Sequence, residues 1–441
     1  LLSVVNDTVT DSLQAIPNVV TKREVFPNYS TALDDSIGVV SIDTLWEAIQ
    51  YEYIYDTSGV ATNTYTTIID STLLISDLNY YKRYPMLFQI MSFVTPYGMG
   101  VDFGENGKSW YFDVTDYSPI LKGSKRMTMS GGGQWQEDMD IKFYFIVGTP
   151  PRDVLDMQQI WRPQSKGYAT IMADDVFESR SHKFRSDATA FKLRSMITGH
   201  GQEGEFVPRI HYLNVNASNP PTHSWQVWTA CAGNPVYPQG GTWIYNRAGW
   251  CPGQATDLKE YDITSLVTPG QSHILDYGIN TASGSSNYWV NNQLVSYGDP
   301  NFTLDAAIIE VLSPTNQILH SRKNPVCSKP KIVIQNTGQN TLTNLRIEYW
   351  VNSASNPEVY QWTGSLDFLE KEEIELPAPN SLWNNIDYSA GVALGDVITY
   401  ENNPSLNKFH VNISQPNGAS DAYMYNNSIS STFTPAPNYP N

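Results

Sequence analysis

Short runs of β-branched and aromatic residues dominate this sequence and restrict it to strand-rich folds. Ile141 to Val147, for example, is bounded by Asp140 and Gly148. Bounded runs of this kind predict β-strands joined by polar turns. Helical periodicity is weak throughout, and only Asp153 to Ile160 suggests one short helix. We therefore predict an all-β protein made of sandwich or barrel domains. The predicted strands are Leu73 to Ile75, Met86 to Val94, Trp110 to Val114, Ile141 to Val147, Lys192 to Ile197, Tyr212 to Val215, His273 to Tyr277 and Ala306 to Val311.

The length of 441 residues allows about three domains of ordinary size. Gly148 to Pro151 ends one strand-rich block, and Leu312 to Pro314 closes a second. A third block pairs the apolar run in 331–338 with Leu345 to Trp350, across a polar turn. This block resembles the immunoglobulin-like modules that follow catalytic domains in secreted bacterial enzymes. The predicted domains are 1–150, 151–316 and 317–441.

Charge and hydropathy exclude two classes of partner. The formal net charge is −17 and no basic patch is present, whereas nucleic-acid binders need Lys and Arg to neutralise phosphates. No apolar run reaches the roughly 18 residues needed to span a membrane. Leu1 to Asn6 lacks an initiating Met and a signal-peptide pattern, so we expect the mature end of a secreted or cell-surface chain, possibly periplasmic.

Three cysteines are present, at positions 231, 251 and 327. Cys231 and Cys251 enclose a short loop rich in Gly, Pro and Trp, and in a secreted protein they would pair. Such a bond would add roughly 3 kcal/mol in the chain-entropy model. Two buried free thiols are the alternative. Cys327 has no evident partner.

The most specific stretch is Asn246 to Gly253, Asn-Arg-Ala-Gly-Trp-Cys-Pro-Gly, preceded by Cys231 to Pro235. It resembles the disulfide-closed loop of the peptide-N-glycosidase F family, including the order of Arg, Trp and Cys. The resemblance covers about residues 85 to 310 and stops after residue 316. The other segments that agree in the family's order are Phe93 to Tyr97, Asp113 to Tyr117, Ile146 to Pro150 and Leu193 to Gly201.

This resemblance implies two eight-stranded antiparallel jelly rolls lying side by side, with the active site between them. It implies hydrolysis of the β-aspartylglucosaminyl amide of an N-linked glycoprotein or glycopeptide, which releases the whole glycan and converts Asn to Asp. It implies no metal and no other cofactor. Amide hydrolysis needs carboxylates, because water must be activated and the departing glycosylamine protonated.

Two acids fall on the family's catalytic positions. Glu205 aligns with the second-domain Glu when Arg209 to His211 is set on the family's Arg-Thr-His; an exposed loop carboxylate is the alternative, and Glu203 could be mistaken for it. Asp70 is the candidate for the primary catalytic Asp, although its neighbours lack the family's Cys, Trp and Arg. A turn aspartate is its alternative, and Asp56 is the fallback.

The resemblance also implies substrate contacts for Arg247 and Trp250, through a fork of donors and a stacking face. A structural role in the disulfide loop is equally open for both. His200 replaces a family Trp and is assigned to the same substrate-binding group, with a hydrogen-bonded loop residue as the alternative. The family's third acid falls on Gly131 to Gly133, where no carboxylate stands, and Glu137 is the nearest replacement.

Two rival functions remain. The first is a glycan-binding or surface-assembly protein that has the same fold but no amidase activity. Such a protein would act in a cell-surface complex. Copper oxidation on a double jelly roll needs clustered His ligands, and the seven histidines include no His-x-His pair. Asp-Ser/Thr-aliphatic triplets, for example at Asp7, resemble the O-glycosylation pattern of Bacteroidota secreted proteins, and sequons such as Asn28 would matter only in a eukaryote.

Overall fold

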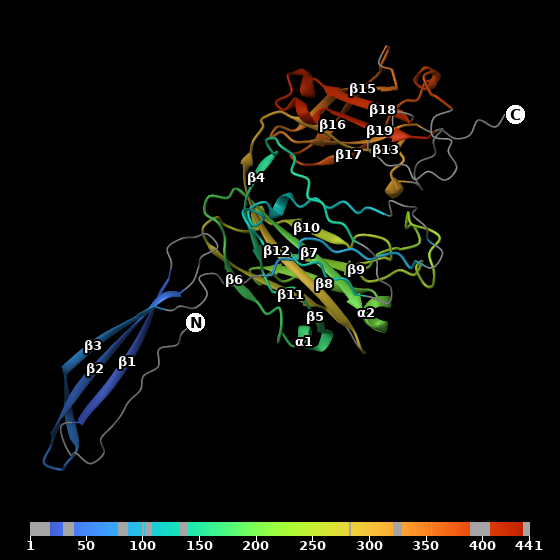
Figure 1. Cartoon of the computed structure of the whole chain (residues 1–441). Coiled ribbons are helices and arrows are strands. Elements are labelled where there is room, and N and C mark those ends of the chain that lie inside the picture. The colour runs from blue at the N-terminus through green and yellow to red at the C-terminus, as the bar shows by residue number, and fades with distance from the viewer. Residues whose placement is uncertain are drawn as a thin grey trace. The chain divides into compact units, whose positions relative to one another are not determined.

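The computed structural model describes residues 18–29, 39–77, 87–98, 101, 108–132, 139–281, 284–320, 329–353, 355–388 and 406–434 (Figure 1). These residues form mostly antiparallel strands with a few short helices, so the predicted all-β class is confirmed. The chain divides into two compact units, Leu1–Leu87 and Phe88–Asn441. Among the described residues, no helix is long and apolar enough to cross a bilayer. Glu137 and Cys327 lie outside the described residues.

The first unit contains one antiparallel sheet in the order β1-β2-β3. Its strands are β1 (Asn18–Tyr29), β2 (Val39–Tyr55) and β3 (Ala61–Asp77). The turn from β2 to β3 follows from its sequence, because Asp56 Oδ1 accepts hydrogen bonds from the backbone N–H of Ser58 and Val60, both at 2.9 Å. Gly59 takes a φ of +79° in that turn, where glycine is favoured.

The second unit begins with a sandwich of two antiparallel sheets. One sheet has the order β10-β7-β12-β4, with β5 also paired to β12, and the other has the order β6-β11-β8-β9. Its core is apolar and includes Phe184, Leu193 and Leu294, none more than 1% exposed. The strands are β4 (Arg152–Gln159), β5 (Gln164–Gly167), β6 (Arg180–Lys183), β7 (Ala190–His200), β8 (Arg209–Val215), β9 (His223–Val227), β10 (Leu258–Asp262), β11 (Ser272–Ile279) and β12 (Asn287–Pro300). The helices are α1 (Tyr168–Met172), α2 (Gln202–Phe206) and the 3-10 turns η1 (Thr115–Tyr117) and η2 (Thr264–Leu266).

The outer face of the β7-β12 sheet carries a polar layer beside an apolar cluster that includes Met157, Val295 and Tyr297. Tyr117 donates to Gln293 Oε1 at 2.8 Å, and Gln293 Nε2 donates to the Gln89 carbonyl at 3.1 Å. Asp116 contacts Lys192 Nζ at 3.0 Å and Arg194 Nη1 at 2.9 Å. Burial acts to raise the pKa of Asp116, but these cations and a hydrogen bond from Tyr297 hold it below its usual range. Gln89 and the turn η1 are thus fixed on the sheet.

The second sandwich of this unit packs a sheet ordered β13-β14-β17 against one ordered β16-β15-β18-β19. Alternating burial along β14 and β18 directs every second side chain inward, as expected for strands with one buried face. The strands are β13 (Ala306–Ser313), β14 (Lys331–Asn336), β15 (Leu342–Val351), β16 (Glu358–Leu366), β17 (Lys371–Glu375), β18 (Asn407–Ser414) and β19 (Ser428–Phe433). Short 3-10 turns are η3 (Ile318–His320), η4 (Asn380–Trp383), η5 (Pro416–Gly418) and η6 (Met424–Asn426).

Several local predictions differ from the structure. The predicted helix at 153–160 is wrong, because Arg152–Gln159 forms β4 and pairs with β12. The described parts of the predicted strands at 86–94, 110–114 and 141–147 lie outside any named strand, apart from a bridge between Phe93 and Ala255. The domain boundaries stay a prediction, although β13 pairs with β14 and so lies in the last sandwich.

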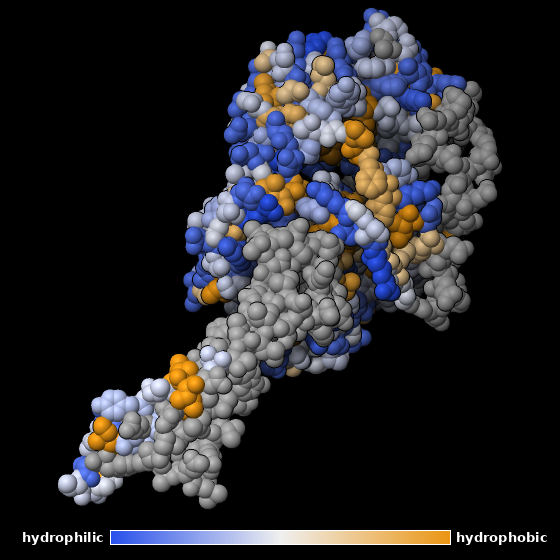
Figure 2. All heavy atoms as spheres, turned by 60° about the vertical axis from the view of Figure 1, so that its left-hand side comes forward, coloured by the Kyte–Doolittle hydropathy of each residue, from blue (hydrophilic) through white to orange (hydrophobic). Residues whose placement is uncertain are grey.

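The surface is largely hydrophilic, with apolar residues gathered in a band on the face of the larger unit that Figure 2 presents. Exposed apolar side chains are frequent in the predicted strand at 141–147. Ile146 and Val147 there are 94% and 97% exposed. The high β-propensity of this run is therefore not sufficient to make it a paired strand.

A pair of carboxylates sits where the last sandwich begins. Asp305 is fully buried and accepts hydrogen bonds from the Tyr423 N–H at 2.7 Å, Thr337 Oγ1 at 2.6 Å and Asn426 Nδ2 at 2.9 Å. Burial, together with a hydrogen bond to Asp305 and its charge, raises the pKa of Asp421 to about 7. Asp421 therefore keeps its proton to a higher pH than an isolated aspartate does.

We expect Asp421→Asn to flatten the pH dependence of thermal stability. The folded-state pKa of Asp421 lies above the ordinary 3.8, so protonation of this carboxyl stabilises the fold fully below pH 3.8. This stabilisation is lost as the pH rises from 3.8 through about 7. The wild type should lose thermal stability over that window, and the variant should lose less. Differential scanning calorimetry at several pH values measures this, with the exposed Asp299→Asn as control. Parallel profiles for all three proteins would contradict the prediction.

Candidate functional site

The site is built around a glycine turn that follows β7. Gly201 takes a φ of +78°, and a Cβ there would lie 2.7 Å from the Ser285 carbonyl oxygen. Cβ atoms at Gly199 and Gly249 would overlap the carbonyl oxygens of Gly204 and Ile197 respectively. Only glycine fits such close backbone approaches. These glycines therefore let α2 and the disulfide loop lie directly against β7.

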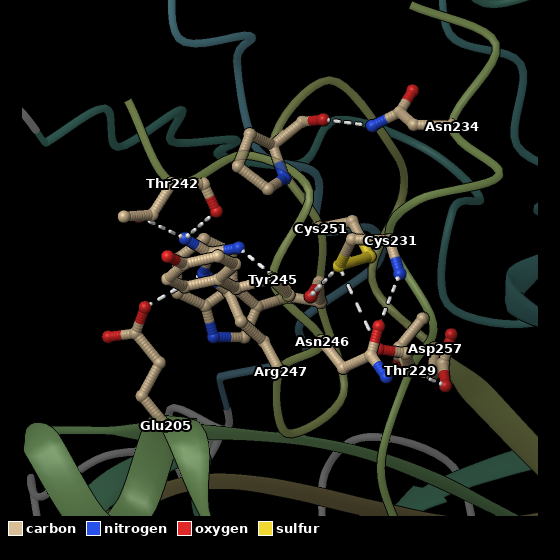
Figure 3. The surroundings of a disulfide bond; sticks show 12 residues. Glu205, Thr229, Cys231, Asn234, Thr242, Tyr245, Asn246, Arg247, Cys251 and Asp257 are labelled. Carbon is tan, nitrogen blue, oxygen red and sulfur yellow. Dashed lines mark hydrogen bonds and ion pairs between the residues drawn. A yellow bond between two sulfur atoms is a disulfide. The ribbon is translucent and has the colours of Figure 1, made fainter. Parts of the chain in front are cut away.

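The Glu205 side chain extends from α2 and forms an ion pair with Arg247 of the disulfide loop (Figure 3). Arg247 Nε donates to Glu205 Oε1 at 2.8 Å, and the backbone is tied as well, because the Ala248 N–H donates to the Glu205 carbonyl at 3.0 Å. The Glu205 side chain is 19% exposed. In the part of the chain that the structure describes, Glu205 Oε2 accepts no hydrogen bond, which leaves it available to water or a ligand.

Arg247 is completely buried, and each of its three guanidinium nitrogens has a hydrogen-bond partner. Nη1 donates to the Tyr245 carbonyl at 2.7 Å, and Nη2 donates to the Thr242 carbonyl and hydroxyl, both at 3.0 Å. The guanidinium carbon lies between 5.0 and 5.6 Å from three ring centroids, which favours the cation further. The rings are those of Tyr97, Phe206 and Trp250.

The contacts of Arg247 and Trp250 with substrate stay predictions. The geometry supports the alternative, in which both residues have a structural role in the disulfide loop. Arg247 is 0% and Trp250 8% exposed, so neither offers much surface to a ligand. Trp250 Nε1 donates to the Gly199 carbonyl at 3.0 Å and stacks on His200, with ring centroids 6.0 Å apart. The Arg247 guanidinium instead holds the Glu205 carboxylate, which is partly exposed.

His200 lies at the exposed end of β7, beside these groups. Its Nε2 is 2.8 Å from Thr198 Oγ1, which fits the hydrogen-bonded alternative. Partial burial lowers the pKa of His200, and the nearby Glu205 carboxylate acts in the opposite direction. A neutral imidazole beside Glu205 can donate or accept a hydrogen bond, so a contact with substrate stays a prediction.

The pairing of Cys231 with Cys251 is confirmed, since the two form a disulfide across 20 residues of sequence. The loop that it closes is fixed internally. Gln239 Nε2 donates to the carbonyls of Val236 at 2.8 Å and Pro252 at 3.0 Å, and Thr229 donates to Asp257 at 2.7 Å. These hydrogen bonds hold the loop, and with it Arg247, in position beside α2.

The other acids named from the sequence lie elsewhere. Glu203 pairs with Arg209 at 3.5 Å and is thereby distinguished from Glu205. Asp70 lies in β3 of the first unit, opposite Ala48 at a register shift, and its catalytic role stays a prediction. Asp56 is an exposed turn residue whose pKa is lowered by a hydrogen bond from the Ser58 side chain. Gly131 and Gly132 are exposed, with open space where a Cβ would stand.

Among the described residues, no group of three or more His, Cys, Asp and Glu side chains is placed to hold a metal ion. The groups that the site offers are a carboxylate, an imidazole, backbone carbonyls and aromatic rings. Sequence reasoning missed Tyr97, Phe206 and Thr242. Phe206 could have been found, because it directly follows Glu205 in the glycine turn.

Residues 167–296 match the family described as peptide-N-glycosidase F, C terminal, and this segment holds Glu205, Arg247 and the disulfide. Over this segment the chain is similar to the peptide-N-glycosidase F family. It is 24% identical over 242 residues to the peptide-N(4)-(N-acetyl-beta-D-glucosaminyl)asparagine amidase F of Elizabethkingia miricola. That alignment covers 50% of this chain and 64% of the relative, so it spans less than two thirds of the relative's length.

Two solved structures show a partial likeness. One is PNGase F, a glycosylasparaginase from Flavobacterium meningosepticum, at 16% identity and a TM-score of 0.36, covering 68% of this chain and 94% of that one. The other is PNGF-II, at 15% identity and a TM-score of 0.33, covering 68% and 64%. At such scores neither comparison bears on fold or function.

We expect Arg247→Leu to lower the free energy of unfolding by about 3 to 5 kcal/mol, because Glu205 and two loop carbonyls would lose their partner inside the protein. Chemical denaturation followed by Trp fluorescence measures this. The exposed Arg162→Leu is the matched control and should change it by no more than about 0.5 kcal/mol. Equal effects of the two substitutions would contradict the structural role of Arg247.

Gly249→Ala should lower the free energy of unfolding by about 1 to 3 kcal/mol, because its positive φ is strained for alanine and the new Cβ would overlap the Ile197 carbonyl. Gly233→Ala lies in the same loop with open space around its Cβ, and it should be nearly neutral. The same denaturation assay compares them. A neutral Gly249→Ala would show that the disulfide loop does not pack on β7 as described.

Proposed function

We propose that this chain hydrolyses the amide bond between an N-linked glycan and asparagine, releasing the intact glycan and leaving aspartate. The observation that carries the proposal is Glu205, held at one oxygen by a buried Arg247 and open at the other. It lies inside the segment that matches the family. The relative from Elizabethkingia miricola is named as an asparagine amidase, which supports the same reaction class here.

The reaction breaks the amide C–N bond and adds water oxygen to the carbonyl carbon. Water must lose a proton as it attacks, and the glycosylamine must gain one as it leaves. In this proposal Glu205 orients the water and the substrate amide through Oε2, while Arg247 fixes the carboxylate by holding Oε1. Asp70 serves as the second acid from the first unit, on the family resemblance alone.

We also propose that the chain acts in an oxidising compartment, as a secreted or surface protein. The disulfide between Cys231 and Cys251 supports this, since such bonds persist outside the reducing cytosol. The bond lies in the loop that carries Arg247, so its loss would loosen the carboxylate that the reaction uses.

Incubation with a denatured glycoprotein and a short glycopeptide, followed by mass spectrometry, tests the activity. We expect release of the whole glycan and conversion of Asn to Asp. Glu205→Gln and Asp70→Asn should each slow release about a hundredfold or more, the scale of losing an acid–base group. Glu203→Gln, in the same helix as Glu205, and Asp56→Asn, in the turn that leads into β3, are the matched controls, and they should release glycan at close to the wild-type rate.

No release from either substrate by correctly folded wild-type protein would overturn the amidase and favour glycan binding without catalysis. Normal release by Asp70→Asn would remove that residue from the mechanism and leave the proposal for Glu205 intact. Thermal unfolding of each variant verifies that lost activity does not reflect lost structure.

A further inference from the structure

The turn formed by residues 242–245, here called the aromatic turn, is fixed by the same guanidinium that holds Glu205. Arg247 donates to the carbonyls of Thr242 and Tyr245 at 3.0 and 2.7 Å, and to Glu205 Oε1 at 2.8 Å. The Tyr245 N–H donates to the Thr242 carbonyl at 3.0 Å, which closes the turn. One rigid planar group therefore sets the position of this turn relative to the carboxylate.

The aromatic turn presents apolar side chains to solvent beside the site. Tyr245 is 56% and Ile244 47% exposed, although the turn is anchored by a fully buried residue. Figure 3 shows the Tyr245 side chain and the Glu205 carboxylate on the same side of the disulfide. Because the backbone of Tyr245 is fixed, a ligand that stacks on its ring has only the two side-chain torsions left to order.

The loop around this turn carries no charge. From Cys231 to Asn246 there is no Asp, Glu, Lys, Arg or His, in a chain with 44 acidic and 27 basic residues. The loop instead holds amide, hydroxyl and aromatic groups. A charged ligand would find no partner in it, whereas a neutral ligand with hydroxyl rims and C–H faces would find both hydrogen-bonding groups and a ring to stack on.

We propose that the aromatic turn is a sugar-binding platform, on which Tyr245 stacks against the sugar next to the bond that Glu205 serves. The identity of that sugar as part of an N-glycan rests on the proposed function. The exposed Tyr245 ring and the uncharged amide and hydroxyl groups of the loop fit the C–H face and hydroxyl rim of a sugar, so the sugar side of the substrate is the proposed occupant. Tyr245 acts in binding, and the carboxylate acts in the reaction.

Tyr245→Ala tests the platform, with Tyr245→Phe as the conservative variant and Tyr425→Ala as the matched control. Tyr425 is 87% exposed and lies in η6 of the last sandwich, so it removes an equivalent exposed ring from another part of the unit. On a glycopeptide, we expect Tyr245→Ala to raise KM about tenfold, the scale of losing an aromatic anchor, with kcat little changed. Tyr245→Phe should keep most of the affinity, and Tyr425→Ala all of it.

A binding measurement without turnover separates this proposal from the amidase. Isothermal titration with the disaccharide of two β1,4-linked N-acetylglucosamines, and separately with the unglycosylated peptide, uses the full chain. Weaker disaccharide binding in Tyr245→Ala but not Tyr425→Ala supports the platform even if wild-type protein releases no glycan. Unchanged disaccharide binding in a folded Tyr245→Ala overturns it. Weakening for the peptide alone overturns it too and assigns the turn to the protein part of the substrate.

Discussion

The buried charge of Arg247 is the constraint around which this region is organised. Moving a guanidinium out of water costs several kcal/mol unless its donors and its charge are both matched. Here one carboxylate, two backbone carbonyls, one hydroxyl and three rings provide the match. The partners come from α2, the disulfide loop and the segment that contains Tyr97. These three stretches of chain must therefore assemble together, since any one missing leaves the cation incompletely paired.

Hydrogen bonds and close backbone contacts at glycines also hold the segments around Arg247 together. Tyr97 is itself tied to the disulfide loop, because its N–H donates to Gln239 Oε1 and its carbonyl accepts from the Gly240 N–H, both at 2.9 Å. The glycines at 199, 201 and 249 remove steric volume where backbones meet. The polar layer of Gln89, Tyr117 and Gln293 then fixes the 87–98 segment on the sheet. A carboxylate held this way keeps its orientation through contacts with the protein itself.

The sequence was informative where a local pattern decides the structure. The strands at Lys192 to Ile197 and Tyr212 to Val215, the disulfide and the glycine turn before Glu205 were all predicted from short patterns and from the family motif. The segment at 153–160 was misassigned because eight residues with scattered apolar positions fit a helix and an edge strand equally, and pairing with β12 decides between them. The burial of Arg247 could not be predicted, since it depends on Tyr97, about 150 residues away in the sequence. Asp70 belongs to a separate compact unit, and its assignment rests on the family resemblance alone.

Strand β13 determines where the chain can be cut to separate the last sandwich from the rest of the protein. It forms the edge of the β13-β14-β17 sheet, and Ala306, Ile308 and Val311 contribute to the same core as β15 and β18. Its strand begins directly after the buried Asp305, only a few residues past the end of β12. A fragment cut at the turn after Pro314 would leave that core open along one side. Transfer of this module to another protein would therefore have to carry residues from about Asn301 onward, including the carboxylate that the loop before η6 wraps around.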